Sequence, residues 1–333
     1  MTDADLPPRD PAAEEALIRS ALAPEINHRL RSARIVARRA VIVAEAGDLD
    51  APGRAELEAA IRTALAPLAG IDEVRIALTA ERRRRRIIAV GSGKGGVGKS
   101  TLTTNLAVAL ARMGRRVGVI DGDIYGPSQP KLLATEGMKP EARGDKLVPI
   151  MSRHGVKVLS LGHIVAPGKA LAWRGPMTGK ALTQLIEADW GETDLLFVDL
   201  PPGTGDVQLS MLSAHRPDGA ILVSTPQDLA LIDAARAGQL FEQGEVPIIG
   251  LVENMAGYAC PHCGKISDPF GSGGVERFAA ALEIPFLGRV PLTLATRIAG
   301  DAGEPPAAGE GEAAAPFHAI AARLARWLDT GKV

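Results

Sequence analysis

GKGGVGKS, at residues 93–100, lies between an apolar run, Ile87–Val90, and a helical pattern, Thr101–Met113. Glycines in such a loop let backbone N–H groups converge on phosphates, and the amino end of the helix adds partial positive charge. We expect Lys99 to reach the outer phosphates and Ser100 to bind Mg2+. The sequence therefore predicts a binding loop for Mg-ATP, made of Gly93, Lys94, Gly95, Gly96, Val97, Gly98, Lys99, Ser100 and Thr101.

Two other apolar runs end in carboxylates that suit a magnesium site. Leu195–Val198 leads to Asp199, and Val117–Ile120 leads to Asp121 and Asp123. Mg2+ prefers oxygen ligands, and the carboxyl edge of a parallel sheet collects the ends of its strands. We expect Asp199 to bind the magnesium ion through water, Asp121 to reach the phosphate site and Asp123 to orient the attacking water. In the alternative, Asp121 and Asp123 only cap the turn that follows them.

The loop carries a second lysine, Lys94, although Lys99 already serves the phosphates. A lysine on the outer side of the loop can act on the nucleotide of a facing protomer, as an arginine finger does in trans. A lysine that only faces solvent is an equal alternative on chemistry alone. The catalytic residues predicted for ATP hydrolysis are Lys94, Lys99 and Asp123.

Short apolar runs alternate with helical stretches over residues 87–333. Runs that are apolar on both faces are typical of parallel strands covered by helices on both sides. We predict an α/β fold here, a doubly wound and mostly parallel sheet. The predicted strands are Ile87–Val90, Val117–Ile120, Leu195–Val198, Ala220–Val223, Ile248–Val252 and Pro285–Leu287. Gly303–Ala315, rich in Gly, Pro, Ala and Glu, is predicted to be a mobile connector to a last helix, Phe317–Leu328.

Residues 1–81 follow a different pattern, which predicts a small α+β module. The predicted order is helix, strand, helix, strand, at Glu14–Leu22, Ile35–Ala44, Arg54–Leu68 and Val74–Leu78. Five consecutive arginines, at residues 82–86, separate this module from the larger domain. Like charges repel one another and stay hydrated, so we interpret the run as a linker; binding to an acidic partner surface is the alternative.

Composition excludes several classes of protein. Of 333 residues, 46% are hydrophobic and 23% are charged, which is typical of a globular protein with a sizeable core. A net charge of -1 gives no overall basic field for nucleic acid. Met1–Glu15 is polar, unlike a signal peptide, and no apolar run reaches the roughly 18 residues that cross a bilayer. We expect a cytoplasmic protein that binds neither nucleic acid nor membrane.

The only two cysteines are close together, in Cys260-Pro261-His262-Cys263-Gly264. A reducing cytosol argues against a structural disulfide. Zinc and iron-sulfur clusters usually take four protein ligands. Four options remain: a histidine completes a metal site, a second protomer completes it, the pair is redox-active, or it has no role. Two protomers with two cysteines each are the simplest way to reach four thiolates.

Taken together and in order, these motifs resemble the Mrp/ApbC family of iron-sulfur cluster carrier ATPases, within the MinD/ParA-like class of deviant P-loop proteins. The resemblance covers nearly all of Arg86–Pro305. Its segments are the loop 93–100 with Lys94, Asp121–Ser128, Trp173–Met177, Asp199–Asp206, Thr225–Asp228 and Val252–Met255, which leads to the cysteines.

This resemblance implies a homodimer that binds ATP and Mg2+ and hydrolyses ATP slowly. It implies a 4Fe-4S cluster on Cys260 and Cys263 of both chains, which is passed to apoproteins. It also implies that Lys94 acts across the dimer and that Asn254 contacts adenine. A 2Fe-2S cluster has the same requirement for four thiolates.

The amino-terminal module resembles, more weakly, a small iron-sulfur assembly domain that is often fused to this family. Where that domain commonly has a cysteine near its second helix, this chain has Ala51–Arg54. We therefore expect the module to bind a partner rather than a cluster. After Val290–Leu292 the family tends to have Asp-Pro, whereas this chain has Thr293-Leu294, which we expect to alter contacts on the adenine side.

Two further hypotheses belong to other classes of function. The first is a MinD/ParA-like positioning ATPase that acts on a membrane or DNA surface. Its support is an amphipathic face of the last helix, formed by Phe317, Ile320, Leu324, Trp327 and Leu328. We favour the simpler interpretation that this face packs on the sheet. In the second hypothesis, Cys260 and Cys263 form a structural zinc site that holds a dimer together.

Overall fold

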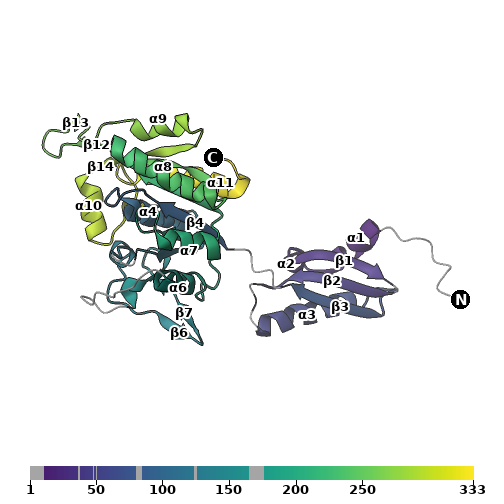
Figure 1. Cartoon of the computed structure of the whole chain (residues 1–333). Helices are drawn as coiled ribbons and strands as arrows, with labels where there is room; N and C mark the ends of the chain where they lie inside the picture. Colours follow the sequence, from purple (N-terminus) through teal and green to yellow (C-terminus); the bar gives the residue numbers. More distant parts are fainter. Residues whose placement is uncertain are drawn as a thin grey trace. The chain divides into compact units, whose positions relative to one another are not determined.

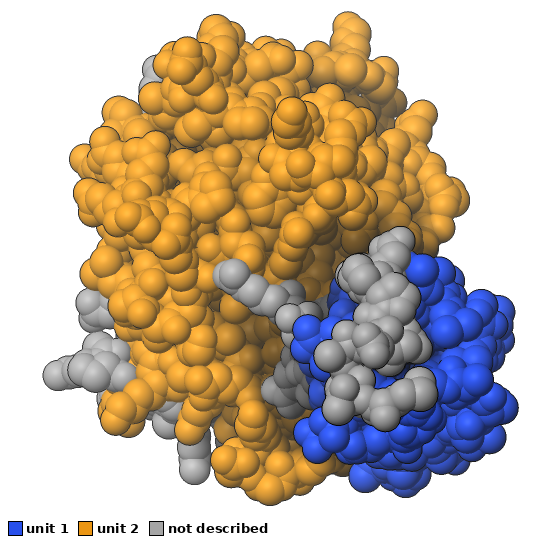
Figure 2. Space-filling model, turned by 90° about the vertical axis from the view of Figure 1, so that its right-hand side faces the viewer, with its two compact units in different colours: residues 1–84 blue, residues 85–333 orange. Residues whose placement is uncertain are grey.

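The computed structural model describes residues 11–36, 38–47, 49, 51–79, 85–123, 126–164 and 176–333. The chain divides into two compact units, Met1–Arg84 and Arg85–Val333, which Figure 2 colours separately. The division lies within the arginine run, of which Arg82–Arg84 are outside the described residues. Each unit has a hydrophobic core of its own.

The first unit is a three-stranded sheet with helices packed on it. Its elements are α1 (Pro11–Ala21), α2 (Pro24–Asn27), β1 (Leu30–Val36), β2 (Arg39–Glu45), α3 (Ala51–Leu65) and β3 (Glu73–Thr79). β1 pairs antiparallel with β2, and β2 pairs parallel with β3. Alternate residues of β2, such as Ile42, are fully buried in one core with Ile18 of α1 and Ile61 of α3.

One strand of this unit differs from the sequence prediction. The single strand predicted at Ile35–Ala44 is wrong, because β1 and β2 form an antiparallel hairpin there. The chain reverses around Arg38, whose backbone is left-handed with φ of 59°. No glycine or asparagine marks this turn, so the apolar residues on its two sides look like one continuous run.

The second unit alternates strands and helices along one large sheet (Figure 1). Its strands are β4 (Arg86–Gly91), β5 (Val117–Asp121), β6 (Glu141–Arg143), β7 (Lys146–Val148), β8 (Ile150–Met151), β9 (Lys157–Ser160), β10 (Leu195–Asp199), β11 (Gly219–Ser224), β12 (Ile248–Ala259), β13 (Ile266–Ser267) and β14 (Phe286–Leu292). Its helices are α4 (Lys99–Arg112), α5 (Gln129–Leu132), α6 (Pro176–Ile186), α7 (Asp206–Ala214), α8 (Asp228–Gln243), α9 (Gly274–Ala281), α10 (Leu294–Asp301) and α11 (Ala315–Thr330), with 3-10 turns η1 (Leu161–His163) and η2 (Pro306–Ala308).

The large sheet is doubly wound, as the alternation of apolar runs predicts. Its order is β13-β12-β11-β4-β10-β5-β9-β8, with β14 paired to β12, and among the described residues only the short end strands β8 and β13 run antiparallel. One face is covered by α4 and α11, whose core includes Leu106 and Phe317. The other face is covered by α6 to α9, with Phe241 and the fully buried Trp190 in its core. All six strands predicted for this unit are present.

The strand register brings the carboxylates to one edge of the sheet. β10 lies between β4 and β5, and Asp199 is level with Val90 on one side and with Asp121 on the other. Because these three strands are parallel, the segments that follow them leave the sheet at the same edge. The loop after β4 therefore meets both carboxylates.

The segment Gly303–Ala315 is packed, so the expectation of a mobile connector is wrong. It contains η2, whose Ala307 is fully buried. The Ala307 N–H donates to Asn105 Oδ1 of α4 at 2.9 Å, and its carbonyl accepts from Arg112 Nη1 at 3.1 Å. Small residues give a flexible composition in the sequence, but here they let the backbone approach α4 closely.

The apolar face of α11 packs inside the second unit. Four side chains of this face lie in the core: Phe317, Ile320, Leu324 and Leu328. Trp327 packs partly buried against them, and the helix contacts α4 and β14. The amphipathic pattern is thus explained by packing. No helix within the described ranges has both the length and the apolar character to cross a membrane.

Candidate functional site

The loop from β4 to α4 has the backbone that phosphate binding requires. Gly96 and Gly98 are left-handed, with φ of 78° and 85°. A side chain on Gly98 would also collide with Asn254, because a Cβ there would lie 2.0 Å from Asn254 Nδ2. The helix begins at Lys99, two residues before the predicted start. Lys94 is exposed on this loop, and its carbonyl accepts from Ser92 Oγ at 3.0 Å.

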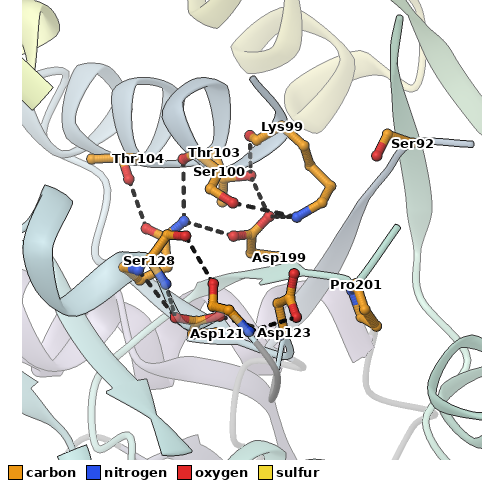
Figure 3. Close-up of polar contacts among 12 residues, drawn as sticks. Ser92, Lys99, Ser100, Thr103, Thr104, Asp121, Asp123, Ser128, Asp199 and Pro201 are labelled. Carbon is orange, nitrogen blue, oxygen red and sulfur yellow. Dashed lines mark hydrogen bonds and ion pairs between the residues drawn. The ribbon is translucent and has the colours of Figure 1, made fainter. Parts of the chain in front are cut away.

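Lys99 and Asp199 form a buried ion pair at the base of the loop (Figure 3). Lys99 Nζ lies 2.5 Å from Asp199 Oδ1, and the two side chains are 7% and 0% exposed. Thr103 Oγ1 lies 3.4 Å from the same oxygen, and Ser100 Oγ lies 3.4 Å from Lys99 Nζ. One hydroxyl and one buried carboxylate suit Mg2+, which keeps several of its water ligands in proteins. Ser100 and Asp199, both predicted to hold Mg2+, lie on either side of Lys99 Nζ, at 3.4 Å and 2.5 Å.

Asp121 is buried and surrounded by donors. Its Oδ2 accepts from the backbone N–H groups of Ser128, at 2.9 Å, and Gln129, at 3.0 Å, and from Ser160 Oγ at 3.1 Å. Burial, and secondly the charge of Asp199, raises the pKa of Asp121 to about 7, although the bonds from Gln129 and Ser160 and the charge of Lys99 oppose the shift. The carboxylate fixes the start of α5, whereas the turn before Gly126-Pro127, which the alternative assigned to both carboxylates, is capped by Asp123 Oδ1.

Asp123 is less enclosed than Asp121. Its side chain is half-buried, and Oδ1 accepts from the Gly126 N–H at 3.2 Å. Its own N–H donates to Asp121 Oδ1 at 3.2 Å, so the first carboxylate holds the backbone of the second (Figure 3). Ile124 and Tyr125, which follow it in the motif, lie outside the described residues. Of the two carboxylates, Asp123 is the one that solvent or a substrate can reach.

A cavity of about 250 Å3 opens beside the first turn of α4. Its walls include Gly98, Thr101, Asn254 and Thr293. Asn254 Nδ2 donates to the Val97 carbonyl at 2.7 Å, which ties β12 to the phosphate loop. The cavity is mostly apolar with a few polar groups, as is usual for sites that bind a flat ring system. Asn254, which is expected to contact adenine, thus borders a cavity next to the phosphate loop.

Thr293, where the family resemblance breaks down, has a structural role in this wall. Its Oγ1 accepts from the Thr296 N–H at 3.1 Å and so caps the amino end of α10. Threonine is a favoured residue at the N-cap, the position directly before the first turn of a helix. Thr293 lines the same cavity as Asn254, and an altered contact on the adenine side stays a prediction.

β12 continues past the predicted end, Val252, to the cysteine pair. Its pairing with β14 shifts register between Asn254 and Tyr258, where Met255 and Gly257 are left-handed with φ of 57° and 77°. Just before this irregularity, Glu253 is fully buried and accepts from Arg289 Nε at 3.0 Å. Sequence reasoning missed Glu253 as a buried carboxylate, because its partner, the exposed Arg289, lies on another strand.

Cys260 and Cys263 lie at the tip of the β12–β13 hairpin. Cys260 is half-buried and Cys263 is exposed; both are free thiols. The Gly264 N–H donates to the Cys260 carbonyl at 2.8 Å, and Gly264 is left-handed with φ of 69°, so the turn closes tightly. N–H groups of His262 and Cys263 lower the pKa of the Cys260 thiol, which favours the thiolate that binds metals. Within the described ranges no group of three or more His, Cys, Asp or Glu side chains could hold a metal ion.

Other parts of the predicted motifs are placed less completely. Trp173–Gly175 lie outside the described residues. Thr225 is buried directly after β11.

Gln129, fully buried beside the ion pair of Lys99 and Asp199, was not predicted from the sequence. No local pattern marks it, since its side-chain partners come from α4 and β10.

The sheet, the loop after β4 and the carboxylates that end β5 and β10 together define a P-loop NTPase. Solved structures agree with this class. A nucleotide-binding protein from Archaeoglobus fulgidus in complex with ADP is similar, with a TM-score of 0.57 and 39% identity, over 66% of this chain and 86% of that one. The septum site-determining protein MinD from Pyrococcus horikoshii, complexed with Mg-ADP, gives a TM-score of 0.56 and 26% identity, over 75% of this chain and 99% of that one.

Sequence relatives narrow this class to one family. The model of the ParA family described as NUBPL iron-transfer P-loop NTPase matches residues 83–325, and the chain belongs to that family. An iron-sulfur cluster carrier protein of Deinococcus radiodurans is 42% identical over 82% of this chain and 81% of its own length. One of Escherichia coli K12 is 45% identical over 73% of this chain and 67% of its own length. The resemblance inferred from the motifs is confirmed.

Proposed function

We propose that this chain, as a homodimer, binds and slowly hydrolyses Mg-ATP and carries an iron-sulfur cluster to acceptor apoproteins. The cluster is cargo, held by Cys260 and Cys263 of both protomers. The observation that carries this proposal is the cysteine pair on an exposed hairpin whose first strand, β12, also borders the nucleotide cavity. The iron-transfer description of the family and the names of the relatives support it.

The number of thiolates is the argument for a dimer. A cluster usually takes four cysteine ligands, and each chain supplies two, so we favour a cluster shared between two protomers. We take the 4Fe-4S type from the family resemblance. Exposed apolar side chains near the starts of three helices support self-association at the edge that holds the phosphate loop. They are Met177 of α6, Leu209 of α7 and Ile232 of α8.

Each residue of the nucleotide site has a proposed task. Lys99 binds the outer phosphates, while Ser100 directly and Asp199 through water hold Mg2+. The ion supplies positive charge that neutralises phosphate oxygens. Asp123 orients the attacking water. Lys94, exposed on the loop, reaches the nucleotide of the facing protomer.

The nucleotide controls the cargo in this proposal. Asn254 contacts adenine, and it lies on the strand that leads to the cysteines. A change of nucleotide then alters the dimer geometry and the exposure of the cluster, and hydrolysis resets the dimer.

The test is anaerobic reconstitution with iron and sulfide, followed by iron and sulfide analysis and an absorption spectrum. We expect about four irons per dimer for the wild type. Cys260→Ala and Cys263→Ala should each abolish retention of the cluster. His262→Ala is the matched control, because it alters the same exposed turn without removing a thiolate, and it should keep the cluster.

Two results would contradict the proposal. A full cluster in either cysteine variant would exclude these ligands. Bound zinc without a stable cluster would make the hairpin structural and favour a positioning ATPase. A parallel assay of phosphate release, with Lys99→Ala as the inactive control, tests hydrolysis separately from the cargo.

A further inference from the structure

Gln129 occupies a place in the nucleotide site that none of the predicted roles covers. It is the first residue of α5 and is fully buried. It directly follows the segment 122–128, which leaves β5 and carries Asp123. Because its side chain is enclosed, it does not reach a bound nucleotide itself.

The side-chain amide of Gln129 joins the phosphate-loop helix to the buried carboxylate of β10. Its Nε2 donates to Asp199 Oδ2 at 2.9 Å and to the Ser100 carbonyl at 3.1 Å. Its Oε1 accepts from Thr104 Oγ1 at 2.6 Å. A carboxylate and a carbonyl only accept hydrogen bonds, so the NH2 group must face them and the orientation of the amide is determined by chemistry.

The backbone of the same residue binds the second carboxylate. The Gln129 N–H donates to Asp121 Oδ2 at 3.0 Å, and Asp121 in turn accepts from the Asp123 N–H at 3.2 Å. Asp121 and Asp199 are level with each other on neighbouring strands. Gln129 thus links both carboxylates, and through Asp121 it is connected to the residue that should orient water.

We propose that Gln129 is a positioning residue for ATP hydrolysis, which fixes the segment carrying Asp123 relative to Asp199 and Ser100. This inference rests on the hydrolytic part of the proposed function. A residue that merely filled the core would affect stability alone. A positioning residue instead affects turnover while nucleotide binding persists, because misplacing a reacting group by about 1 Å costs up to about 100-fold in rate.

The experiment compares Gln129→Met with the wild type in steady-state phosphate release and in equilibrium binding of ATP. Methionine keeps an unbranched side chain of similar size but removes the amide. We expect kcat to fall about 10- to 100-fold while the Kd for ATP changes less than about threefold. Tryptophan fluorescence of each variant checks that the second unit is folded.

Thr104 supplies a second route that leaves Gln129 in place. Thr104→Val removes the hydroxyl that holds Oε1 and should lower kcat in the same direction by a smaller factor. Thr104→Ser keeps the hydroxyl and should restore turnover close to the wild type. The double variant Gln129→Met with Thr104→Val should be no slower than Gln129→Met alone, since both changes remove the same hydrogen bond between Thr104 and Gln129.

The outcomes separate this inference from the proposal beneath it. Wild-type hydrolysis with an unchanged kcat in Gln129→Met or in Thr104→Val would overturn the inference and leave the proposed function standing. Equal loss of kcat and of ATP affinity would also overturn it, because that pattern belongs to a structural role. A wild type that binds ATP without hydrolysing it would remove the hydrolytic function and this inference together.

Discussion

Replacing Lys99 with methionine tests how strongly the second unit depends on its buried ion pair. Methionine fills most of the space of the lysine stem, so the change removes the charge with little loss of packing. Asp199 is 0% exposed and would be left as a buried charge without its cation. Breaking such a pair from one side costs about 3–5 kcal/mol. Since Asp199 keeps its bond from Gln129 at 2.9 Å, we expect the lower end, about 3 kcal/mol.

The assay is equilibrium unfolding in urea, followed by tryptophan fluorescence. All three tryptophans, at residues 173, 190 and 327, belong to the second unit, so the signal excludes the first. Lys99→Met combined with Asp199→Asn removes the unpaired charge and should recover part of the lost stability. A loss below about 1 kcal/mol in the single variant, or no recovery in the double variant, would refute this account of the pair.

Two further predictions concern the same unit. The pKa of Asp121, about 7 in the folded chain, lies above the ordinary value of 3.8, so the folded state binds the proton more tightly. The free energy of unfolding of the wild type should therefore fall, relative to that of Asp121→Asn, as pH rises from about 4 to about 7. If the free energies of unfolding of the two proteins changed equally over this range, the prediction would be contradicted. Gly118→Ala would place a Cβ 2.5 Å from Trp190 Cζ3 and should cost about 1–3 kcal/mol in the same assay. Gly238→Ala is its control, because a Cβ there would lie 3.5 Å from its nearest neighbour, and it should not lower the free energy of unfolding. Equal urea midpoints for the two variants would show that Trp190 can move to make room for the added Cβ.

The parts of the site that were predictable are those determined by local sequence. The phosphate loop needs Gly96 and Gly98 for their left-handed backbone, and that requirement is visible as glycine spacing. Asp121 and Asp199 were predictable because each ends an apolar run in a sheet whose strands are parallel. Such features depend on a few consecutive residues and on general rules of the fold.

The parts that were missed depend on contacts between distant segments. Gln129 meets a residue 70 positions away, and no pattern near it marks that partner. Ala307 looks like part of a flexible stretch until its bond with Asn105 of α4 is known. The turn at Arg38 carries no turn residue, and the left-handed conformation there is imposed by the pairing of β1 with β2. Composition describes such segments poorly because their structure is determined by what packs on them.

The path of β12 also limits how the length of this chain can vary. The strand carries Asn254 at the phosphate loop and, past the left-handed Met255 and Gly257, leads into Cys260. One residue inserted at Tyr258 or Ala259 would shift their pairing with Ser267 and Ile266 of β13 and move the cysteine by about 3.3 Å. Insertions and deletions in natural versions of this chain should therefore be absent from 258–259 and be found instead in surface segments such as 141–148, where β6 and β7 form a separate hairpin.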